Sequence, residues 1–384
     1  MPITVEAPTP NIKQLSGKDP NGALLLSVLV RHTYHQDSEG RWVLAPEQQP
    51  LVGGLVENEA GELIADPDLF PWKGKTDLVL QGHAYGRGRD QFDVNIWVSG
   101  QSVKKIRVIG NREVAALGNG EIYFGPPAVV GKIPLSYTRA YGGTDKAAEA
   151  TGPNGWLKTA KELSLPEDEI QLMNVYRYPR NPLGRGYLIE ATVEAIHQIA
   201  LPNLEDPLDL LTPKRLTVHN PGYWHRMPLP QSTGWLDSGW FPRLAYMGAC
   251  QGTLDEPKSI AEIDRGFAPK NILERRDMST DDIFRLIQGA SLGLQLPHFR
   301  GGETITIDNV TPDGNRFGFR VPERPKIWVD GRRGTMKETE PVIHTVVVEP
   351  DLKRVSIVWR GAAPAIRPYL PDELAKMPLK VVWG

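Results

Sequence analysis

The sequence of 384 residues contains a single cysteine, Cys250. One cysteine cannot form a disulfide within the chain, and it cannot supply the several thiolates of a metal cluster. Its neighbours in MGACQGTL are small, which is typical of a buried thiol rather than of an activated nucleophile. This cysteine usage fits a reducing compartment such as the cytoplasm.

Long apolar runs and an excess of either charge are also missing. The longest apolar run, from Ala23 to Val30, is far below the ~20 residues that a membrane-crossing helix needs. The start, MPITVEAPTP, lacks the basic residues and the apolar stretch of a secretory signal. The formal net charge is −2, so there is no basic surplus of the kind that binds nucleic acid. We therefore expect a cytoplasmic protein that binds neither a membrane nor nucleic acid.

Two glycine-rich loops carry arginines and invite comparison with phosphate-binding loops: GRGRD at 86–90 and NPLGRGYL at 181–188. Neither loop has the Gly-x-Gly-x-x-Gly spacing of a dinucleotide site, and no Gly-Lys-Ser/Thr sequence closes a P-loop. We predict that both are turns with glycines at positive φ, in which the arginine pairs locally with a carboxylate or a carbonyl group. No nucleotide or other cofactor is expected.

Motifs for metal binding and catalysis are missing as well. His219 and His225 are separated by a Pro-Gly turn and have no third ligand nearby, whereas zinc sites usually need three or four convergent ligands. There is no Gly-x-Ser-x-Gly nucleophile elbow. The acidic clusters at 166–169 and 281–282 are typical of loops and of first helical turns. We predict no metal site and no catalytic residues, so the chain is not expected to be an enzyme.

Glycine and proline are the abundant residues. The 38 glycines and 34 prolines together make up about 19% of the chain, against roughly 12% in average usage, and they are spread along it. Between them lie alternating segments such as FDVNIWV at 92–98, with one apolar face. The segment HTVVVEPDLKRVSIVW at 344–359 is typical of a hairpin. These patterns predict antiparallel strands joined by many specific turns.

The predicted fold is mainly β, with two antiparallel β regions that are sandwich-like or barrel-like. We place an N-terminal arm at 1–21 and the first β region at 22–139. A loop-rich middle with a few short helices follows at 140–302, and the second β region with a tail occupies 303–384. These boundaries follow the change from alternating segments to the weakly periodic middle.

Two helices are expected within the middle, at 187–200 and at 279–290. The first has apolar residues near one face, and the second begins with Ser and Thr caps and acidic residues before a glycine stop. The alternative is a set of long loops over the two β regions, and ordered loops of that length often bind a partner.

Three segments of the sequence occur in a fixed order: PLSYTRAYGGTD at 134–145, NPLGRGY at 181–187 and LPNLEDP at 201–207. Together they resemble the signature blocks of a large bacterial family known as a domain of unknown function. Members of that family are encoded beside type VI secretion genes, next to PAAR-repeat and VgrG spike proteins. The resemblance extends over roughly residues 22 to 361.

This resemblance implies an adaptor, also described as an effector chaperone. Such a protein binds a secreted effector or its PAAR-type carrier in the cytoplasm and helps to load it on the VgrG spike. No catalysis is attributed to the family as a whole. Two other functions compete with the adaptor: a hydrolytic enzyme or toxin delivered by the same system, and a structural part of the secretion apparatus.

Aromatic residues and arginines crowd one segment of the middle, and these residue types commonly carry binding energy at interfaces. The candidate partner-binding residues are Tyr223, Trp224, Arg226, Trp235, Trp240 and Arg243. The alternative for this cluster is a second small core under the long loops, because both roles need buried aromatic side chains.

Four charged residues of the signature blocks are candidates for a structural role. We expect Arg139 and Arg185 to pair with acids such as Asp145 and Glu205. Such pairs would hold the middle loops on the β framework or hold a partner, rather than a nucleotide.

Overall fold

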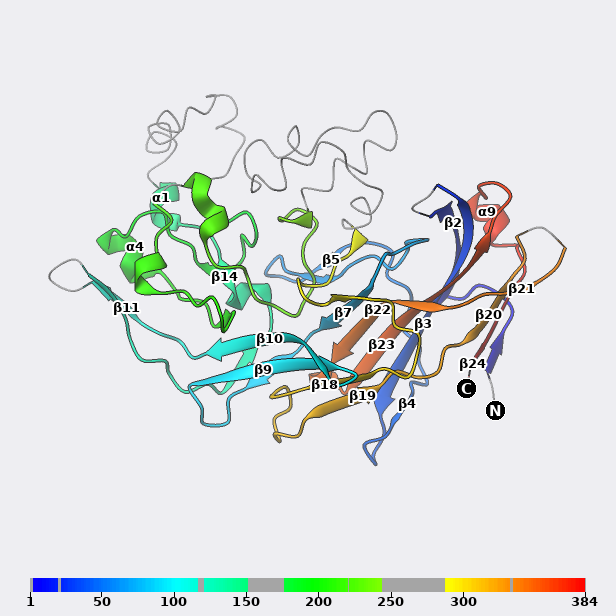
Figure 1. Ribbon diagram of the computed structural model, residues 1–384, viewed down its shortest axis with the longest axis horizontal. Coiled ribbons are helices and arrows are strands. Elements are labelled where there is room, and N and C mark those ends of the chain that lie inside the picture. The colour runs from blue at the N-terminus through cyan, green and yellow to red at the C-terminus, as the bar shows by residue number, and fades with distance from the viewer. Residues whose placement is uncertain are drawn as a thin grey trace, which may run out of the picture.

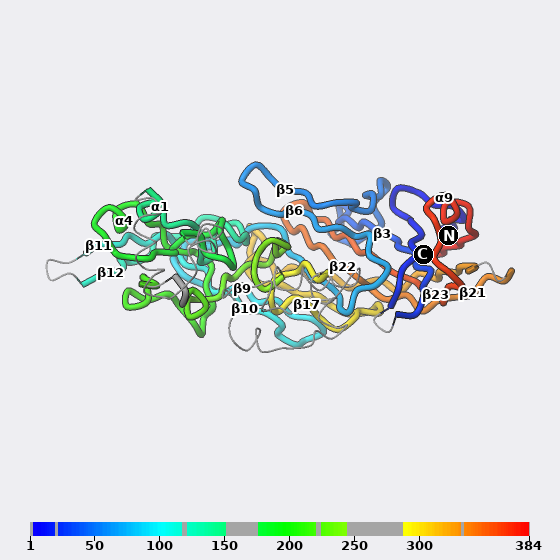
Figure 2. Tube along the Cα trace, turned by 90° about the horizontal axis from the view of Figure 1, so that it is seen from above, coloured from blue at the N-terminus to red at the C-terminus, as the bar shows by residue number. Residues whose placement is uncertain are grey.

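The structure is a computed structural model, which describes residues 3–19, 22–116, 121–150, 176–219, 221–243, 287–331 and 334–383. The fold is mainly β, with 40% strand and 10% helix, and it contains several antiparallel sheets. The predicted fold class is therefore confirmed, although no sheet closes into a barrel in the part of the molecule that is described. The molecule is elongated, with the β11–β12 hairpin (Val114–Ala116 and Ile122–Phe124) at one end and both termini at the other (Figures 1 and 2).

The largest sheet has seven strands, in the order β17-β7-β22-β23-β3-β2 with β4 added beside β3. Its strands are β17 (Gln295–Leu296), β7 (Thr76–Leu80), β22 (Val342–Glu349), β23 (Arg354–Pro364), β3 (Leu24–Gln36), β2 (Ile12–Lys18) and β4 (Trp42–Leu44). All pairs are antiparallel except β7 with β22. β3 is buried on both faces over most of its length, which explains its continuous apolar sequence.

A five-stranded antiparallel sheet has the order β16-β10-β9-β18-β19. Its strands are β16 (Leu204–Glu205), β10 (Gln101–Ile109), β9 (Gln91–Val98), β18 (Thr304–Ile307) and β19 (Phe317–Arg320). In β9, Phe92, Val94 and Ile96 are buried, as their alternation with polar residues predicts. The short strand β16 brings the third signature block to the edge of this sheet.

The remaining strands form smaller sheets. One has four strands, β1 (Ile3–Val5), β24 (Leu379–Trp383), β20 (Lys326–Val329) and β21 (Lys337–Glu338), in that order. The two-stranded sheets are β11–β12, β5 (Val56–Glu57) with β6 (Leu63–Ala65), β8 (His83–Tyr85) with β13 (Lys132–Pro134), and β14 (Tyr141–Gly142) with β15 (Arg185–Gly186). The N-terminal arm thus contains β1 and β2, which pair with β24 and β3.

Strands from the two ends of the sequence alternate within common sheets. β3 pairs with β23, β7 with β22, and β9 with β18. The predicted hairpin near the C-terminus is present: β22 and β23 are joined by the 3-10 turn η5 (Pro350–Leu352), after which Lys353 has a φ of 49°. The first and second β regions therefore share their sheets and their core.

Helices are short and few in the described residues. Besides η5, they are α1 (Lys146–Ala150), α4 (Val193–Gln198), α9 (Pro371–Leu374) and the 3-10 turns η1 (Tyr137–Arg139), η2 (Pro213–Arg215) and η3 (Pro221–Arg226). The helix expected at 187–200 is shorter than predicted, because its first residues are held in extended pairing: the Tyr187 amide donates to the Gly142 carbonyl oxygen. Thr192 caps α4 by accepting from the Ala195 amide at 3.1 Å. The helix expected at 279–290 lies largely outside the described residues.

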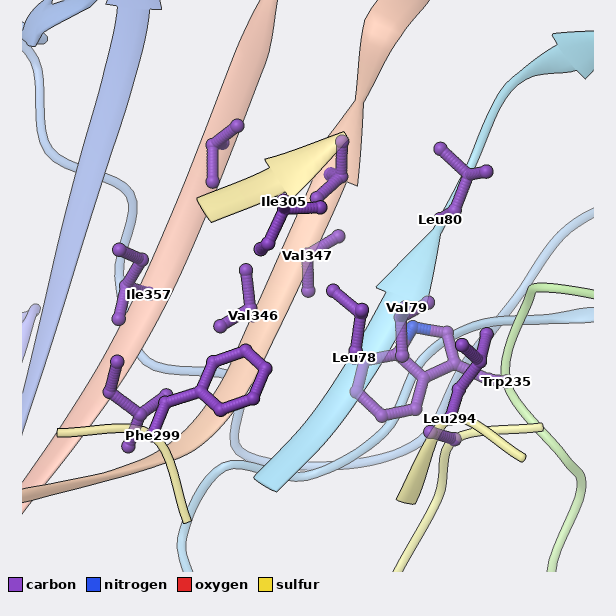
Figure 3. Packing of buried hydrophobic residues seen from close by; sticks show 14 of the residues in the cluster. Leu78, Val79, Leu80, Trp235, Leu294, Phe299, Ile305, Val346, Val347 and Ile357 are labelled. Atoms are coloured by element: carbon purple, nitrogen blue, oxygen red, sulfur yellow. The ribbon is translucent and has the colours of Figure 1, made fainter. Parts of the chain in front are cut away.

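The main core lies between the two large sheets and takes side chains from both ends of the sequence. Figure 3 shows Leu78 of β7 and Val346 of β22 packed with Phe299, Leu294 and Trp235, which come from the middle and its exit. A second cluster lies under the middle loops. It consists of Tyr141, Tyr178, Tyr187, Leu188, Ala195, Leu201, Leu211, Leu216, Val218, Trp224, Met227 and Phe241.

Candidate functional site

The first two signature blocks lie against each other backbone to backbone. β14 and β15 pair in parallel, with Tyr141 opposite Arg185 and Gly142 opposite Gly186. The Arg185 amide donates to the Ala140 carbonyl oxygen at 3.0 Å. Segments more than forty positions apart are therefore joined by a short ladder, and the blocks meet at one place in the molecule.

Glycines are required at this crossing because the two backbones approach so closely. A Cβ on Gly142, whose φ is +142°, would lie 2.1 Å from the carbonyl oxygen of Asn181. A Cβ on Gly184 would lie 2.4 Å from Asn181 Nδ2 and 2.6 Å from the Ala140 carbonyl oxygen. The glycines of NPLGRGY and AYGGTD thus permit close packing of the two backbones.

Asn181 ties these two blocks together from inside. The side chain is fully buried, and its Nδ2 donates to the carbonyl oxygens of Tyr137 at 2.8 Å and Tyr141 at 3.0 Å. One amide group therefore satisfies two buried carbonyl groups of the first block, which would be costly to leave without partners.

Arg185 reaches from the second block to the first and the third. Its Nε donates to the Thr138 carbonyl oxygen at 3.1 Å, and Nη1 donates to Asn203 Oδ1 at 3.4 Å. Asn203 is itself buried and donates to the Ile109 carbonyl oxygen of β10 at 3.0 Å. Burial, and then the charge of Arg139, lower the pKa of Arg185. Arg185 thus links the second block to the first and the third through neutral partners.

The predicted pairing of the block arginines with Asp145 and Glu205 is not what the structure shows. Asp145 is buried and accepts from the backbone amides of Ala148 and Ile189, both at 2.9 Å. It stabilises the start of α1 with no cation paired to it among the described residues, since backbone amides satisfy a carboxylate well.

Glu205 pairs instead with Arg112, which lies outside the signature blocks. The Arg112 guanidinium donates to Glu205 Oε1 and to the Pro202 carbonyl oxygen, while Oε2 accepts from the Leu211 amide at 2.6 Å. Burial raises the pKa of Glu205, and Arg112 opposes that shift. Arg139 is half-buried, and its guanidinium makes no hydrogen bond or ion pair with any described residue.

Two recesses open beside this crossing, and Arg185 lines both. One, of about 340 Å³, lies between the glycine-rich blocks and α4, and its lining includes Asp145 and Lys146. The other, of about 430 Å³, shares Ile199 and Ala200 with the first and is also lined by Arg112, Glu113 and His197. The first two signature blocks therefore line the smaller recess, and Arg185 and Leu201 bring the second and third blocks to the larger one.

The candidate partner-binding tryptophans are core residues in this structure. Trp224, Trp235 and Trp240 are 1%, 3% and 7% exposed, and Arg243 is 4% exposed. Trp240 packs edge-to-face on Tyr137 with ring centroids 5.4 Å apart. Figure 3 shows Trp235 beside Leu294 in the main core. Trp235 and Trp240 thus belong to the main core, and Trp224 belongs to the second cluster, the small core that was the alternative to an interface.

The two remaining candidate partner-binding residues are Arg226 and Tyr223. Arg226 is exposed at the end of η3. The Tyr223 side chain lies outside the described residues. A cavity of about 100 Å³ is lined by Trp224 together with Leu229 and Leu292. These two leucines are 40% and 41% exposed.

The GRGRD loop is a tight turn, as predicted. Arg87 and Gly88 have φ angles of 51° and 83°. Arg87 Nη2 and Arg89 Nη2 both donate to Asn309 Oδ1, at 2.6 and 2.9 Å. The loop thus pins the start of β9 to the turn after β18.

Sequence reasoning missed Asn181, Asn203 and Arg112, which satisfy the buried groups of the site. Two of the three, Asn181 and Asn203, stand inside the quoted signature blocks, so the blocks pointed to them, but Arg112 has no sequence signal.

Among the described residues, no three His, Cys, Asp or Glu side chains converge as metal ligands would. No helix in the described ranges has the length and apolar character needed to cross a bilayer.

The model of a family described as "Uncharacterized protein conserved in bacteria (DUF2169)" matches residues 21–360. Because the match extends over most of the sequence, the protein belongs to this family. No curated protein and no solved structure matches the sequence.

Proposed function

We propose that this protein is an adaptor, or effector chaperone, of a type VI secretion system. In this proposal it binds a secreted effector or its PAAR-type carrier in the cytoplasm and helps to load the cargo on the VgrG spike. The family match covers residues 21–360, nearly the same range as the resemblance to adaptor signature blocks. The shared range supports the use of family-level expectations for the whole protein.

The observation that carries the proposal is the convergence of the three signature blocks. They are far apart in the sequence, yet β14, β15 and the start of β16 meet around Arg185. The meeting place has recesses of about 340 and 430 Å³ at the surface, lined by charged and polar side chains. A surface built by the most characteristic sequences of a family is a natural place for a shared function, and this one has the polarity of a protein-binding site.

The neighbouring surface suits a reversible protein contact. Val193, at the start of α4, is 72% exposed and Leu208, after β16, is 95% exposed. Exposed apolar side chains beside polar recesses resemble the mixed surfaces of non-obligate interfaces. An adaptor must release its cargo at the spike, so an interface near the standard ~1,600 Å² of total buried area is expected.

The proposal is tested by deleting the gene for this protein in the native bacterium. Secretion of the effector encoded nearby and secretion of the tube protein are measured together. The proposal expects the effector to be lost from the medium while the tube protein is still secreted. Loss of both would make the protein a structural part of the apparatus, and loss of neither would overturn the adaptor function.

A pull-down of the tagged protein from the same strain provides the direct test of binding. The proposal expects the neighbouring effector or a PAAR-type protein to be recovered. Recovery of neither, in a strain that produces both, counts against the proposal. If instead the purified protein hydrolyses cell-wall or lipid substrates, the alternative of a delivered hydrolytic toxin is supported.

A further inference from the structure

Arg139 and Arg185 carry charge that no acid neutralises within the described residues. Arg185 donates only to two neutral oxygens, the Thr138 carbonyl and Asn203 Oδ1. Arg139 makes no side-chain hydrogen bond or ion pair there, and it is near enough to Arg185 to lower the pKa of that guanidinium. Two half-buried cations side by side repel each other, and they lose part of their hydration.

Three other arginines with largely buried side chains have an acidic partner. Arg31 pairs with Asp68 at 3.1 Å, and Arg243 pairs with Asp66 at 3.0 Å. Arg112, which lines the larger recess, pairs with Glu205. Arg360, which is 8% exposed, instead donates to the Pro71 carbonyl oxygen at 3.1 Å. Arg185 combines the lack of an acidic partner among the described residues with a place in the lining of both recesses, whereas charges removed from water are normally paired.

The free side of Arg185 is accessible from the recesses. Arg185 is one of the residues that line both the 340 Å³ and the 430 Å³ cavity. Its Nη2 makes no hydrogen bond with a described residue, and it is not among the buried polar atoms that lack a partner. Nη2 therefore remains available to a ligand that enters either recess.

The charges that line the 340 Å³ recess favour a ligand with one negative charge. Its charged lining residues are Lys146, Arg185 and Asp145. Two cations against one anion leave a formal excess of one positive charge. A carboxylate would balance this excess, whereas a doubly charged phosphate would exceed it. The planar guanidinium also suits the two oxygens of a carboxylate.

We propose that Arg185, with Arg139 beside it, binds a carboxylate group that a partner protein inserts into the recess. The carboxylate belongs either to an acidic side chain or to the C-terminus of the partner. This identification of the source rests on the proposed adaptor function, but the carboxylate site itself does not depend on it. Binding would neutralise the arginine pair and dock the partner on the signature blocks.

The experiment measures thermal unfolding of the full-length protein in increasing concentrations of two small carboxylates. N-acetylglycinate represents the C-terminus of a protein, and N-acetylaspartate amide represents an acidic side chain. Sodium chloride at equal ionic strength and inorganic phosphate serve as the comparisons. A ligand that binds only the folded state raises Tm with concentration. We expect a larger rise with a carboxylate than with chloride or phosphate, and the mimic with the larger rise identifies the source.

Variants of the two arginines show whether the carboxylate raises Tm by binding at this site. Arg185→Gln and Arg139→Gln should each weaken carboxylate binding about tenfold or more, because each removes a charged group from the site. Arg139→Gln removes no hydrogen bond, so its fold is retained even if Arg185→Gln unfolds. Arg320→Gln, an exposed arginine at the end of β19, is the matched control and should keep the wild-type response.

Several results would overturn the site: a wild-type protein that responds to carboxylates no more than to chloride, a larger response to phosphate, or an unchanged response in Arg139→Gln. The carboxylate site and the proposed adaptor function are tested by different results, so one can be disproved while the other stands. If the deletion strain exports every effector normally, the adaptor function fails, yet a carboxylate response lost in Arg139→Gln still establishes the site. If effector export stops but the wild-type protein shows no carboxylate response, the site fails and the adaptor function stands.

Discussion

Arg243 and Asp66 form a two-pronged ion pair in the interior although they are 177 positions apart. Nη1 lies 3.0 Å from Oδ1, and Nη2 lies 3.3 Å from Oδ2. The side chains are 5% and 0% exposed. Burial raises the pKa of Asp66, and the charge of Arg243 opposes that shift. Because Arg243 closes the aromatic segment and Asp66 follows β6, the pair fastens the middle of the sequence to the first β region.

Loss of one member of this pair should be costly. We expect Arg243→Gln to lower the free energy of unfolding by about 3–5 kcal/mol, because the Asp66 charge stays buried without its partner. Urea unfolding measures the change. The control is Arg41→Gln, which breaks an ion pair with Asp37 in which the arginine is 68% exposed. Exposed pairs contribute about 0–1 kcal/mol, so equal losses in the two variants would contradict the prediction.

The glycine crossing of the signature blocks should not tolerate a side chain. Gly142→Ala places a Cβ 2.1 Å from the Asn181 carbonyl oxygen on a backbone with φ of +142°. We expect a loss of at least about 2 kcal/mol, from overpacking and backbone strain together. Gly74→Ala is the control, since nothing lies within 4 Å of its Cβ. A Gly142→Ala protein with wild-type stability would mean that the two blocks separate without cost.

The β regions could be predicted because burial on one or both faces leaves a local pattern. In β9 the buried Phe92, Val94 and Ile96 alternate with less buried residues, so the period of two is visible in the sequence. What the pattern could not show is which strands pair. The parallel contact of β7 with β22 joins residues more than 260 positions apart, and nothing local in either strand specifies that partner.

The candidate functional site could also be predicted only in part, because its contacts join residues that lie far apart in the sequence. Glycine spacing excluded a phosphate loop and predicted turns, which the positive φ angles confirm. The aromatic segment was ambiguous, because interface anchors and core residues share a composition. Its burial depends on partners far along the sequence, such as Tyr137 under Trp240. The buried pair Lys73–Asp77, with 2.9 Å between Nζ and Oδ2, has no sequence signal either.

A buried histidine should make the protein less stable in mild acid. His344 is 1% exposed and both ring nitrogens lack a partner among the described residues. Burial lowers its pKa well below the ordinary value. The folded state therefore keeps His344 neutral while the unfolded state takes up a proton below about pH 6.5. Stability is full above that pH and falls as the pH drops, by up to about 1.4 kcal/mol per pH unit for this group.

The variant His344→Leu isolates this contribution. Its unfolding free energy should fall less steeply than that of the wild type between pH 6.5 and 5. Other groups titrate in both proteins, so the difference in slope reports His344 alone. Ile343→Val, at the neighbouring buried position, should cost about 0.5–1.5 kcal/mol at every pH without changing the slope. Equal slopes in His344→Leu and the wild type would show that the ring is accessible to protons when folded.

Arg185→Ala should destabilise the protein less than loss of a buried ion pair does. Its partners are the Thr138 carbonyl oxygen and Asn203 Oδ1, so no acid is left stranded. We expect a loss of about 1–3 kcal/mol, the cost of leaving buried hydrogen-bonding groups without a partner. Chemical denaturation measures it, with Arg320→Ala as the exposed control. An unchanged stability would mean that water replaces the guanidinium at both oxygens.

The last prediction separates core from contact surface in the aromatic segment. Trp224 packs on Phe241 with ring centroids 5.5 Å apart, and the Arg180 guanidinium lies 4.8 Å from a Trp224 ring centroid. Trp224→Ala should therefore lower the free energy of unfolding by about 3–5 kcal/mol. Any loss of cargo in a pull-down would then follow from unfolding, not from a missing contact.

Arg226 provides the matched variant, because it lies in the same segment but its side chain is exposed. Arg226→Ala should change the free energy of unfolding by about 1 kcal/mol or less. Both variants are compared with the wild type by urea unfolding and by recovery of the neighbouring effector or PAAR-type protein. If Arg226→Ala keeps its stability but loses the cargo, the segment contributes to the contact surface through the exposed side chain of Arg226. If Trp224→Ala keeps its stability and loses the cargo, the tryptophan is a contact residue and its burial changes when the partner binds.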